Sequence, residues 1–471
     1  MTLESRQNMS LEEMDQHSLI HPFTNLKDYS SGKLGGPRIV TGGSGIRIQD
    51  QHGNQLIDAF AGLYCVNIGY GRTEVAEAIA EQAHKLAYYH AYAMNSNEPA
   101  IRLSHRLVNM APGGMARVYF GLSGSDANET QVKLVWFYNN VLGRPEKKKI
   151  ISRHRGYHGG SVMSGSLTGL PVYHTAFDLP VKGVLHTSTP HHYWHATEGE
   201  DERAFSKRCA AELEEMILAE GPDTVAAFIG EPVLGTGGII PPPEGYWDEI
   251  QAVLQKYDIL LIADEVVCGF GRIGTPFGCD RYGIKPDLIT VAKGLTSAYQ
   301  PLSGAIVGEK VWKVLEQASD SIGPFSHGYT YSAHPVGAAA ALANLDVIER
   351  DDLTGNAERV GGYLNQRLAE TFGDHPIVGE VRGVGMLAAV EFVADPARKT
   401  RFDPSMKVGA RLSAAVLAEG VIARAMPHGD ILGFAPPLVM TREEVDEIVE
   451  KVGRGVAKVT DELVSEGAIK V

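Results

Sequence analysis

The chain has 471 residues, 44% of them hydrophobic and 21% charged, a composition typical of globular proteins and a length that suits two domains. A formal net charge of −14 argues against nonspecific binding to nucleic acid or to an anionic membrane, because both require a basic face. The four cysteines lack the paired spacing of a metal site or a disulfide framework. Because no signal peptide or membrane span is evident, we expect a cytoplasmic protein.

The N-terminal part predicts little regular structure. Residues 1 to about 35 are polar and predict an arm or a short helix. A hairpin is expected around His52-Gly53-Asn54, followed by a buried, glycine-rich loop over 61–71. Two helices are expected next, one capped by Thr73 and one opened by Asn97.

From residue 118 onward, short apolar runs alternate with helical patterns. Strands are expected at 118–120, 150–151, 224–230, 259–263 and 288–292. A turn over 121–125 and a helix over 127–141 follow the first strand. The apolar strands do not alternate with polar residues, as is expected when both faces of a sheet are covered. Residues 61–330 therefore predict a three-layer α/β domain with a mainly parallel sheet.

The pattern of predicted elements changes after residue 330. Helices are expected at 335–349, 356–372 and 406–419, with paired strands over 382–392. A last helix begins with a capping box of Thr441 and Glu444. Residues 331–471 predict a smaller α+β domain, which we expect the N-terminal segment 1–60 to join.

One lysine stands at the end of an apolar strand. Lys293 closes the run 287–292 and is followed at once by Gly294. Lysine is depleted from strands and is almost never fully buried unless paired. Lys293 is therefore either an edge charge that reaches solvent or an amine kept for nucleophilic chemistry, such as a Schiff base.

A turn rich in small residues precedes the helix expected at 127. Ser123, Gly124 and Ser125 would leave backbone N–H groups free at a helix N-terminus and add hydroxyl donors. This arrangement suits a phosphate. An ordinary turn between strand and helix with a serine cap is the alternative.

Acidic residues end two of the apolar strands. Asp264 and Glu265 follow 260–263, and Glu231 follows 227–230. Ligands collect at the carboxyl ends of parallel strands, and a carboxylate there could keep a pyridine nitrogen protonated. The alternative is an ordinary solvated strand end. Against it, Glu231 and Lys293 also follow apolar strands, so a charged residue stands at the end of three strands.

An aromatic residue lies in another loop that follows a strand. Tyr157 is flanked by Gly156 and His158 and could stack on a planar cofactor. Packing within the protein is the alternative for a lone tyrosine.

Two other motif matches are disfavoured. Residues 269–274 fit G-x-G-x-x-G, but we expect no helix directly after them, and two acids stand where a pyrophosphate should approach. The histidine-rich run 191–195 has no acidic or cysteine partner at ligand spacing, so we predict a surface or entrance loop and no metal.

Taken together, these motifs resemble the class III (omega) aminotransferases, pyridoxal-phosphate enzymes of fold type I. The resemblance covers the chain from about residue 35 to its end and is closest to amine:pyruvate and omega-amino-acid:pyruvate transaminases. The segments that carry it are 123–125, 156–159, 231–232, 261–269, 287–294, 328–332, Arg424 and 435–438.

The resemblance implies a role for each residue around pyridoxal 5′-phosphate. Lys293 would form the Schiff base and carry a proton, while Asp264 would pair with the pyridine nitrogen. The remaining cofactor contacts would come from Tyr157 and Val266 on the two ring faces, from Ser123, Gly124 and Ser125 on the phosphate, and from His158 and Glu231 nearby. Thr330 of the neighbouring subunit would join the phosphate site in a homodimer, alone or within a tetramer.

For the substrates, the resemblance implies an amine or omega-amino acid as donor and a keto acid, most of all pyruvate, as acceptor in a ping-pong reaction. Arg424 would bind a carboxylate, and Tyr64 stands where many relatives carry a tryptophan that lines the pocket. Three alternatives remain open: an aminomutase or decarboxylase that uses the same cofactor, a nicotinamide oxidoreductase that uses 269–274, and a binding protein without activity.

Overall fold

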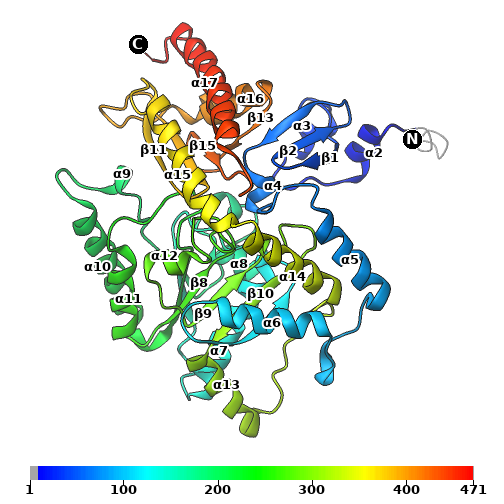
Figure 1. Cartoon of the computed structure of the whole chain (residues 1–471). Helices are drawn as coiled ribbons and strands as arrows, with labels where there is room; N and C mark the ends of the chain where they lie inside the picture. The colour runs from blue at the N-terminus through cyan, green and yellow to red at the C-terminus, as the bar shows by residue number, and fades with distance from the viewer. Residues whose placement is uncertain (1–8, 470–471) are drawn as a thin grey trace.

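The computed structural model describes residues 9–469 of the chain. A seven-stranded sheet with helices on both faces forms the larger part of the molecule, and two four-stranded sheets form the rest. In Figure 1 the smaller sheets lie above the large one, beside the C-terminal helices α15 (Leu353–Phe372), α16 (Val408–Ala418) and α17 (Arg442–Ser465). No helix within 9–469 is both long and apolar enough to cross a membrane.

The large sheet has the strand order β4-β10-β9-β8-β7-β5-β6. Only β10 runs antiparallel to its neighbours, so the predicted α/β fold with a mainly parallel sheet is confirmed. The strands are β4 (Met115–Gly121), β5 (Lys149–Arg153), β6 (Val184–Thr187), β7 (Val225–Gly230), β8 (Leu260–Asp264), β9 (Leu288–Val291) and β10 (Ser303–Gly308). The carboxyl ends of β7, β8 and β9 therefore meet at one edge.

Both faces of this sheet are buried, which explains why its strands are apolar throughout. In β8, Leu260 and Ile262 pack into one hydrophobic cluster, whereas Leu261 and Ala263 pack into the other. The first cluster includes helices α7 (Gly124–Val141), α8 (Val162–Leu167) and α13 (Glu309–Ile322). The second includes α6 (Glu98–Met110), α10 (Glu202–Glu220), α11 (Tyr246–Lys256) and α14 (Pro335–Arg350).

The two smaller sheets join distant parts of the chain. The first contains β1 (Val40–Ser44), β2 (Arg47–Asp50), β3 (Gln55–Asp58) and β13 (Val421–Ile422), and β13 pairs parallel with β3. The second contains β11 (Val378–Val384), β12 (Leu387–Phe392), β15 (Ile431–Phe434) and β14 (Arg424–Ala425). The remaining α-helices are α2 (Leu11–Ser18), α3 (Leu26–Ser30), α4 (Ala61–Tyr64), α5 (Thr73–Leu86), α9 (His192–His195) and α12 (Gly278–Tyr282).

The helix starts differ from the predictions in three places. Helix α7 begins at Gly124 rather than at 127, because Ser123 and Asp126 form a capping box. Thr73 is the first residue of α5 and not its cap, which is Arg72. Helix α15 begins at Leu353 because the side chain of Asp352 caps it.

Candidate active site

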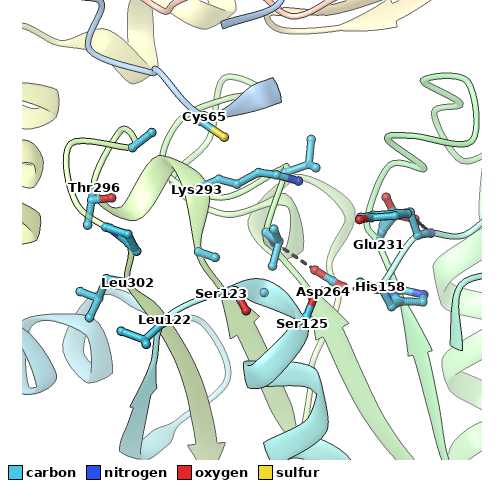
Figure 2. A pocket seen from close by; sticks show the side chains of 18 of the residues that line it. Cys65, Leu122, Ser123, Ser125, His158, Glu231, Asp264, Lys293, Thr296 and Leu302 are labelled. Atoms are coloured by element: carbon cyan, nitrogen blue, oxygen red, sulfur yellow. Dashed lines mark hydrogen bonds and ion pairs between the residues drawn. The ribbon is translucent and has the colours of Figure 1, made fainter. Parts of the chain in front are cut away.

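A cavity of about 320 Å³ opens at the carboxyl ends of β7, β8 and β9. Most of the predicted site residues line it, namely Ser123, Gly124, Ser125, Tyr157, His158, Glu231, Asp264, Val266 and Lys293. Figure 2 shows the Lys293 side chain extending across this space toward the side of Glu231 and His158, with Ser123 and Ser125 at the start of the helix below. Packing of the sheet thus gathers loops that follow separate strands.

The amine of Lys293 lies between two aromatic rings. Its Nζ atom is 5.6 Å from the ring centre of Tyr64 and 6.0 Å from that of Tyr157. Among the side chains described, which lie within 9–318 and 322–469, no carboxylate is within ion-pair distance of this amine. The backbone of Lys293 has φ +44°, which costs a non-glycine residue roughly 1–2 kcal/mol and is typical of functional sites. The structure thus holds a lysine in a strained position without an acidic partner.

The carboxylate of Asp264 is held from several sides. His158 Nδ1 lies 2.8 Å from Asp264 Oδ2, and the backbone N–H of Val266 donates to Oδ1 at 3.1 Å. A further contact, not predicted from the sequence, comes from Asn128, whose Nδ2 donates to Oδ2 at 3.0 Å. The only sequence signal for this contact was position, because Asn128 lies three residues after Ser125, just past the predicted phosphate turn.

Glu231 is buried beside this group and orders the loop of Tyr157. Its carboxylate accepts hydrogen bonds from the backbone N–H groups of Tyr157, at 3.0 Å, and Gly235, at 2.8 Å. Burial raises the pKa of this carboxyl above its ordinary value. Glu231 therefore fixes the backbone that carries the aromatic wall.

The N-terminus of α7 also lines the cavity. Gly124 and Ser125 are the first two helical residues, and such N–H groups have no partner within their own helix. Gly124 also packs closely on Val266, because a Cβ atom added at Gly124 would lie 3.1 Å from Val266 Cγ2. The helix end thus offers free donors in a space that a side chain at Gly124 would narrow.

Three predicted residues do not line the cavity. Tyr64 is buried, with its ring near Lys293 and its hydroxyl without a partner. The guanidinium of Arg424 lies 5.5 Å from the ring centre of Phe60 and forms no ion pair with the residues described. Thr330 is exposed, and its carbonyl accepts a hydrogen bond from Tyr88.

The glycine match at 269–274 meets a further obstacle in the structure. A short helix, α12, does begin at Gly278, contrary to the prediction. However, the carboxylate of Glu265 already accepts hydrogen bonds from the N–H groups of Gly278, at 2.9 Å, and Cys279, at 2.7 Å. Burial raises the pKa of Glu265 to about 7. A pyrophosphate would have to displace this acid.

The histidine run is not a surface loop throughout, because His191 is buried and has acidic partners from β11 and β12. The prediction failed because Glu380 and Glu391 are distant in sequence. Ligand atoms of the three residues lie within 4.8 Å of one another. Arg382 donates hydrogen bonds to Glu380 Oε2, at 2.7 Å, and to Glu391 Oε2, at 2.6 Å. These are the two oxygens that face His191 Nε2. We therefore describe these residues as an ion-pair cluster.

The cavity fits pyridoxal 5′-phosphate by the chemistry of its residues. The N-terminus of α7 suits the phosphate. Because Gly124 has no side chain, the narrow space between it and Val266 is not filled by the protein. Tyr157 and Val266 line the same cavity as that helix end and the Asp264 carboxylate. Lys293 supplies an amine near the Tyr157 ring that has no carboxylate partner among the residues described.

Comparison with known proteins gives the family. The sequence model of the aminotransferase class-III family matches residues 30–456. The chain is 65% identical to the diaminobutyrate–2-oxoglutarate transaminase of Halomonas elongata, over 98% of each chain. It is 43% identical to a chloroplastic gamma aminobutyrate transaminase of Solanum lycopersicum, over 96% of this chain and 87% of that protein.

A solved structure agrees with these sequence matches. The omega transaminase of Pseudomonas jessenii in complex with PMP superposes with a TM-score of 0.93 at 45% identity, covering 96% of this chain and 99% of that one. The family match, the fold and the cavity together show that the chain belongs to the class III aminotransferases, fold type I enzymes that use pyridoxal 5′-phosphate.

Proposed function

We propose that the enzyme moves an amino group from an amine or omega-amino acid to a keto acid, by a ping-pong reaction that depends on Lys293. One observation carries this proposal. The Lys293 amine has no carboxylate partner among the residues described and shares its cavity with Asp264 and the N-terminus of α7. An unpaired amine in such a place is available to react.

Each lining residue has a part in this proposal. When bound, the cofactor supplies an electron sink next to the substrate carbon. Lys293 holds the cofactor and moves a proton at that carbon, and Asp264 binds the pyridine nitrogen. Tyr157 and Val266 bracket the ring, while Ser123, Gly124 and Ser125 bind the phosphate. His158 and Glu231 hold Asp264 and the Tyr157 loop in place.

The substrate carboxylate is assigned to Arg424, which has no ion pair within residues 9–469 and can pair with a carboxylate in a bidentate manner. Tyr64 would form an aromatic wall next to Lys293. We propose pyruvate as the acceptor, from the sequence resemblance. A second candidate is 2-oxoglutarate, which the 65% identity to the Halomonas enzyme favours.

We also propose a homodimer, alone or paired into a tetramer, in which Thr330 reaches the phosphate site of the neighbouring subunit. Thr330 is exposed and does not line the cavity of its own chain. Apolar side chains of the N-terminal arm are exposed and would be covered, namely Leu11, Leu19, Ile20, Phe23 and Leu26. Composition and cysteine spacing support a cytoplasmic location.

The visible absorbance of the purified enzyme tests the reaction. We expect a yellow protein that bleaches with β-alanine and recovers with a keto acid, and parallel additions of pyruvate and 2-oxoglutarate rank the two acceptors. Turnover of an amine without any keto acid would instead support an aminomutase or decarboxylase. A protein that never binds added pyridoxal phosphate would contradict the proposal and reopen the oxidoreductase hypothesis.

A further inference from the structure

One buried polar side chain next to the cavity forms several hydrogen bonds to other residues. Asn128, in the second turn of α7, is 1% exposed. Its Nδ2 atom donates to Asp264 Oδ2 at 3.0 Å and to the carbonyl of His158 at 2.8 Å. Its Oδ1 atom accepts from the hydroxyl of Thr290 at 2.8 Å. Every polar atom of the carboxamide is therefore paired.

These contacts allow one orientation of the amide. Turning the carboxamide by half a turn would place Oδ1 against the Asp264 carboxylate and the His158 carbonyl, which are both acceptors. Thr290, fully buried on β9, completes the orientation by donating to Oδ1. A buried network in which every member is satisfied is rigid. Asn128 can therefore transmit a fixed geometry.

The geometry it transmits concerns the two oxygens of Asp264. Oδ2 receives both side-chain contacts, from His158 Nδ1 and Asn128 Nδ2. Oδ1 accepts only the backbone N–H of Val266 and keeps acceptor capacity. Rotation of the carboxylate would break the contacts to Oδ2. With the carboxylate held in this rotation, Oδ1 is always the oxygen that stays free to accept a further hydrogen bond.

We propose that Asn128, oriented by Thr290, is a positioning residue that fixes the rotation of Asp264 so that one oxygen stays available to the cofactor's pyridine nitrogen. The inference rests on the proposed role of Asp264. It also ties together three elements that hold the cofactor, because Asn128 lies on the phosphate-binding helix α7, Asp264 ends β8, and Thr290 lies on the strand that leads to Lys293. A displacement of one of these elements would then change the hydrogen bonds that join it to the other two.

The test compares Asn128→Leu with a matched variant in the same helix, using the holoenzyme. Gln131→Leu also removes a buried hydrogen bond to β9, from Gln131 Nε2 to the Ile289 carbonyl, without touching Asp264. We expect Asn128→Leu to lower kcat by about tenfold to a hundredfold, the range for a lost hydrogen bond to a charged group, with little change in KM. It should also alter the visible absorbance of the bound cofactor. Gln131→Leu should lower the thermal midpoint but keep the spectrum and kcat.

Thr290 supplies a milder variant that keeps the shape of the side chain. Thr290→Val should lower kcat by about threefold to tenfold and alter the spectrum in the same sense, since a neutral hydrogen bond is weaker. Thr290→Ser keeps the hydroxyl and should restore both readouts. If Asn128→Leu does not fold, this pair of variants decides the question.

The outcomes separate the inference from the proposal beneath it. If Asn128→Leu or Thr290→Val folds and keeps the spectrum and kcat of the parent, while Asp264→Ala loses both, the positioning role is overturned and the role of Asp264 stands. If Asp264→Ala also keeps both, the role of Asp264 itself is wrong. Equal changes in Gln131→Leu and Asn128→Leu would show a structural effect only, which overturns the inference.

Discussion

Two regions of this molecule bury charged groups next to a histidine, and they treat those charges differently. In the ion-pair cluster, His191, Glu380, Arg382 and Glu391 are paired with one another. In the cavity, His158 and Asp264 are paired, but the cation Lys293 has no carboxylate partner among the residues described, and Asp264 Oδ1 keeps acceptor capacity. Residue types are similar in the two places, whereas the number of partners that the chain supplies differs.

The difference distinguishes an ion-pair cluster from the site that we propose to be reactive. Lys293 is partly buried and lines an open cavity, so its amine can meet a ligand that supplies the partner the described residues lack. In the ion-pair cluster, by contrast, the chain itself supplies a guanidinium to both carboxylates. The variants below test whether each region behaves as this comparison requires.

The largest effect is expected from removing the unpaired amine. Lys293→Ala should lower the rate of the amine half-reaction by about 10⁴-fold, because no nearby group can replace it as the proton carrier. The matched control is Lys147→Ala, at a buried lysine outside the cavity, whose ammonium donates to the carbonyls of Pro222 and Tyr257. Stopped-flow absorbance measures both, and a Lys293→Ala enzyme within tenfold of the parent would contradict the comparison.

Breaking the ion-pair cluster should instead affect stability. Arg382→Met leaves the carboxylates of Glu380 and Glu391 without their shared guanidinium, which we expect to cost about 3–5 kcal/mol of unfolding free energy. Arg203→Met, at an exposed pair with Glu244, should cost less than about 1 kcal/mol. Denaturant unfolding gives both values. Similar costs in the two variants would show that the buried cluster is not special.

The histidine of the cluster should make stability depend on pH. Burial lowers the pKa of His191 to about 4, below its value in the unfolded chain. The unfolded chain then binds more protons between about pH 4 and pH 6.5, so the unfolding free energy falls as the pH is lowered through this window, by up to about 3 kcal/mol.

The variant His191→Gln isolates this contribution. His186 and His428, whose pKa values burial also lowers to about 4, remain in both proteins, so the difference reports His191. Unfolding midpoints from pH 7 to pH 4 should fall less steeply in the variant. Parallel slopes would mean that His191 has the same pKa in the folded and the unfolded chain, which would contradict the prediction.

A smaller effect is expected at the second cation without a carboxylate partner. Arg424→Gln should lower kcat/KM for β-alanine by about tenfold to a hundredfold, since a bidentate pair with the carboxylate is lost. Turnover of benzylamine, which has no carboxylate, should change by less than about threefold. Arg424→Lys should restore only part of the loss. An equal loss for both amines would show that Arg424 acts on the fold rather than on the substrate.

Much of the fold and the core of the site could be predicted from sequence because they depend on neighbouring residues. The buried run before Asp264 predicted a strand, since its residues face two hydrophobic layers. The start of α7 was locally encoded as well and was still missed, because its capping box uses Asp126 where glutamate or glutamine is usual. The predicted division at residues 60 and 330 stays a prediction.

The sequence by itself determined which residues stand at strand ends, and with them the family and the residue that we propose as the reactive group, Lys293. Only the tertiary structure decided which distant residues complete each group: Asn128 for Asp264, and Glu380, Arg382 and Glu391 for His191. The physical reason is that strand and helix patterns arise from local backbone preferences and burial, whereas these contacts depend on how separate elements pack. Whether a buried charge is neutralised within the chain or left for a ligand is therefore settled by packing.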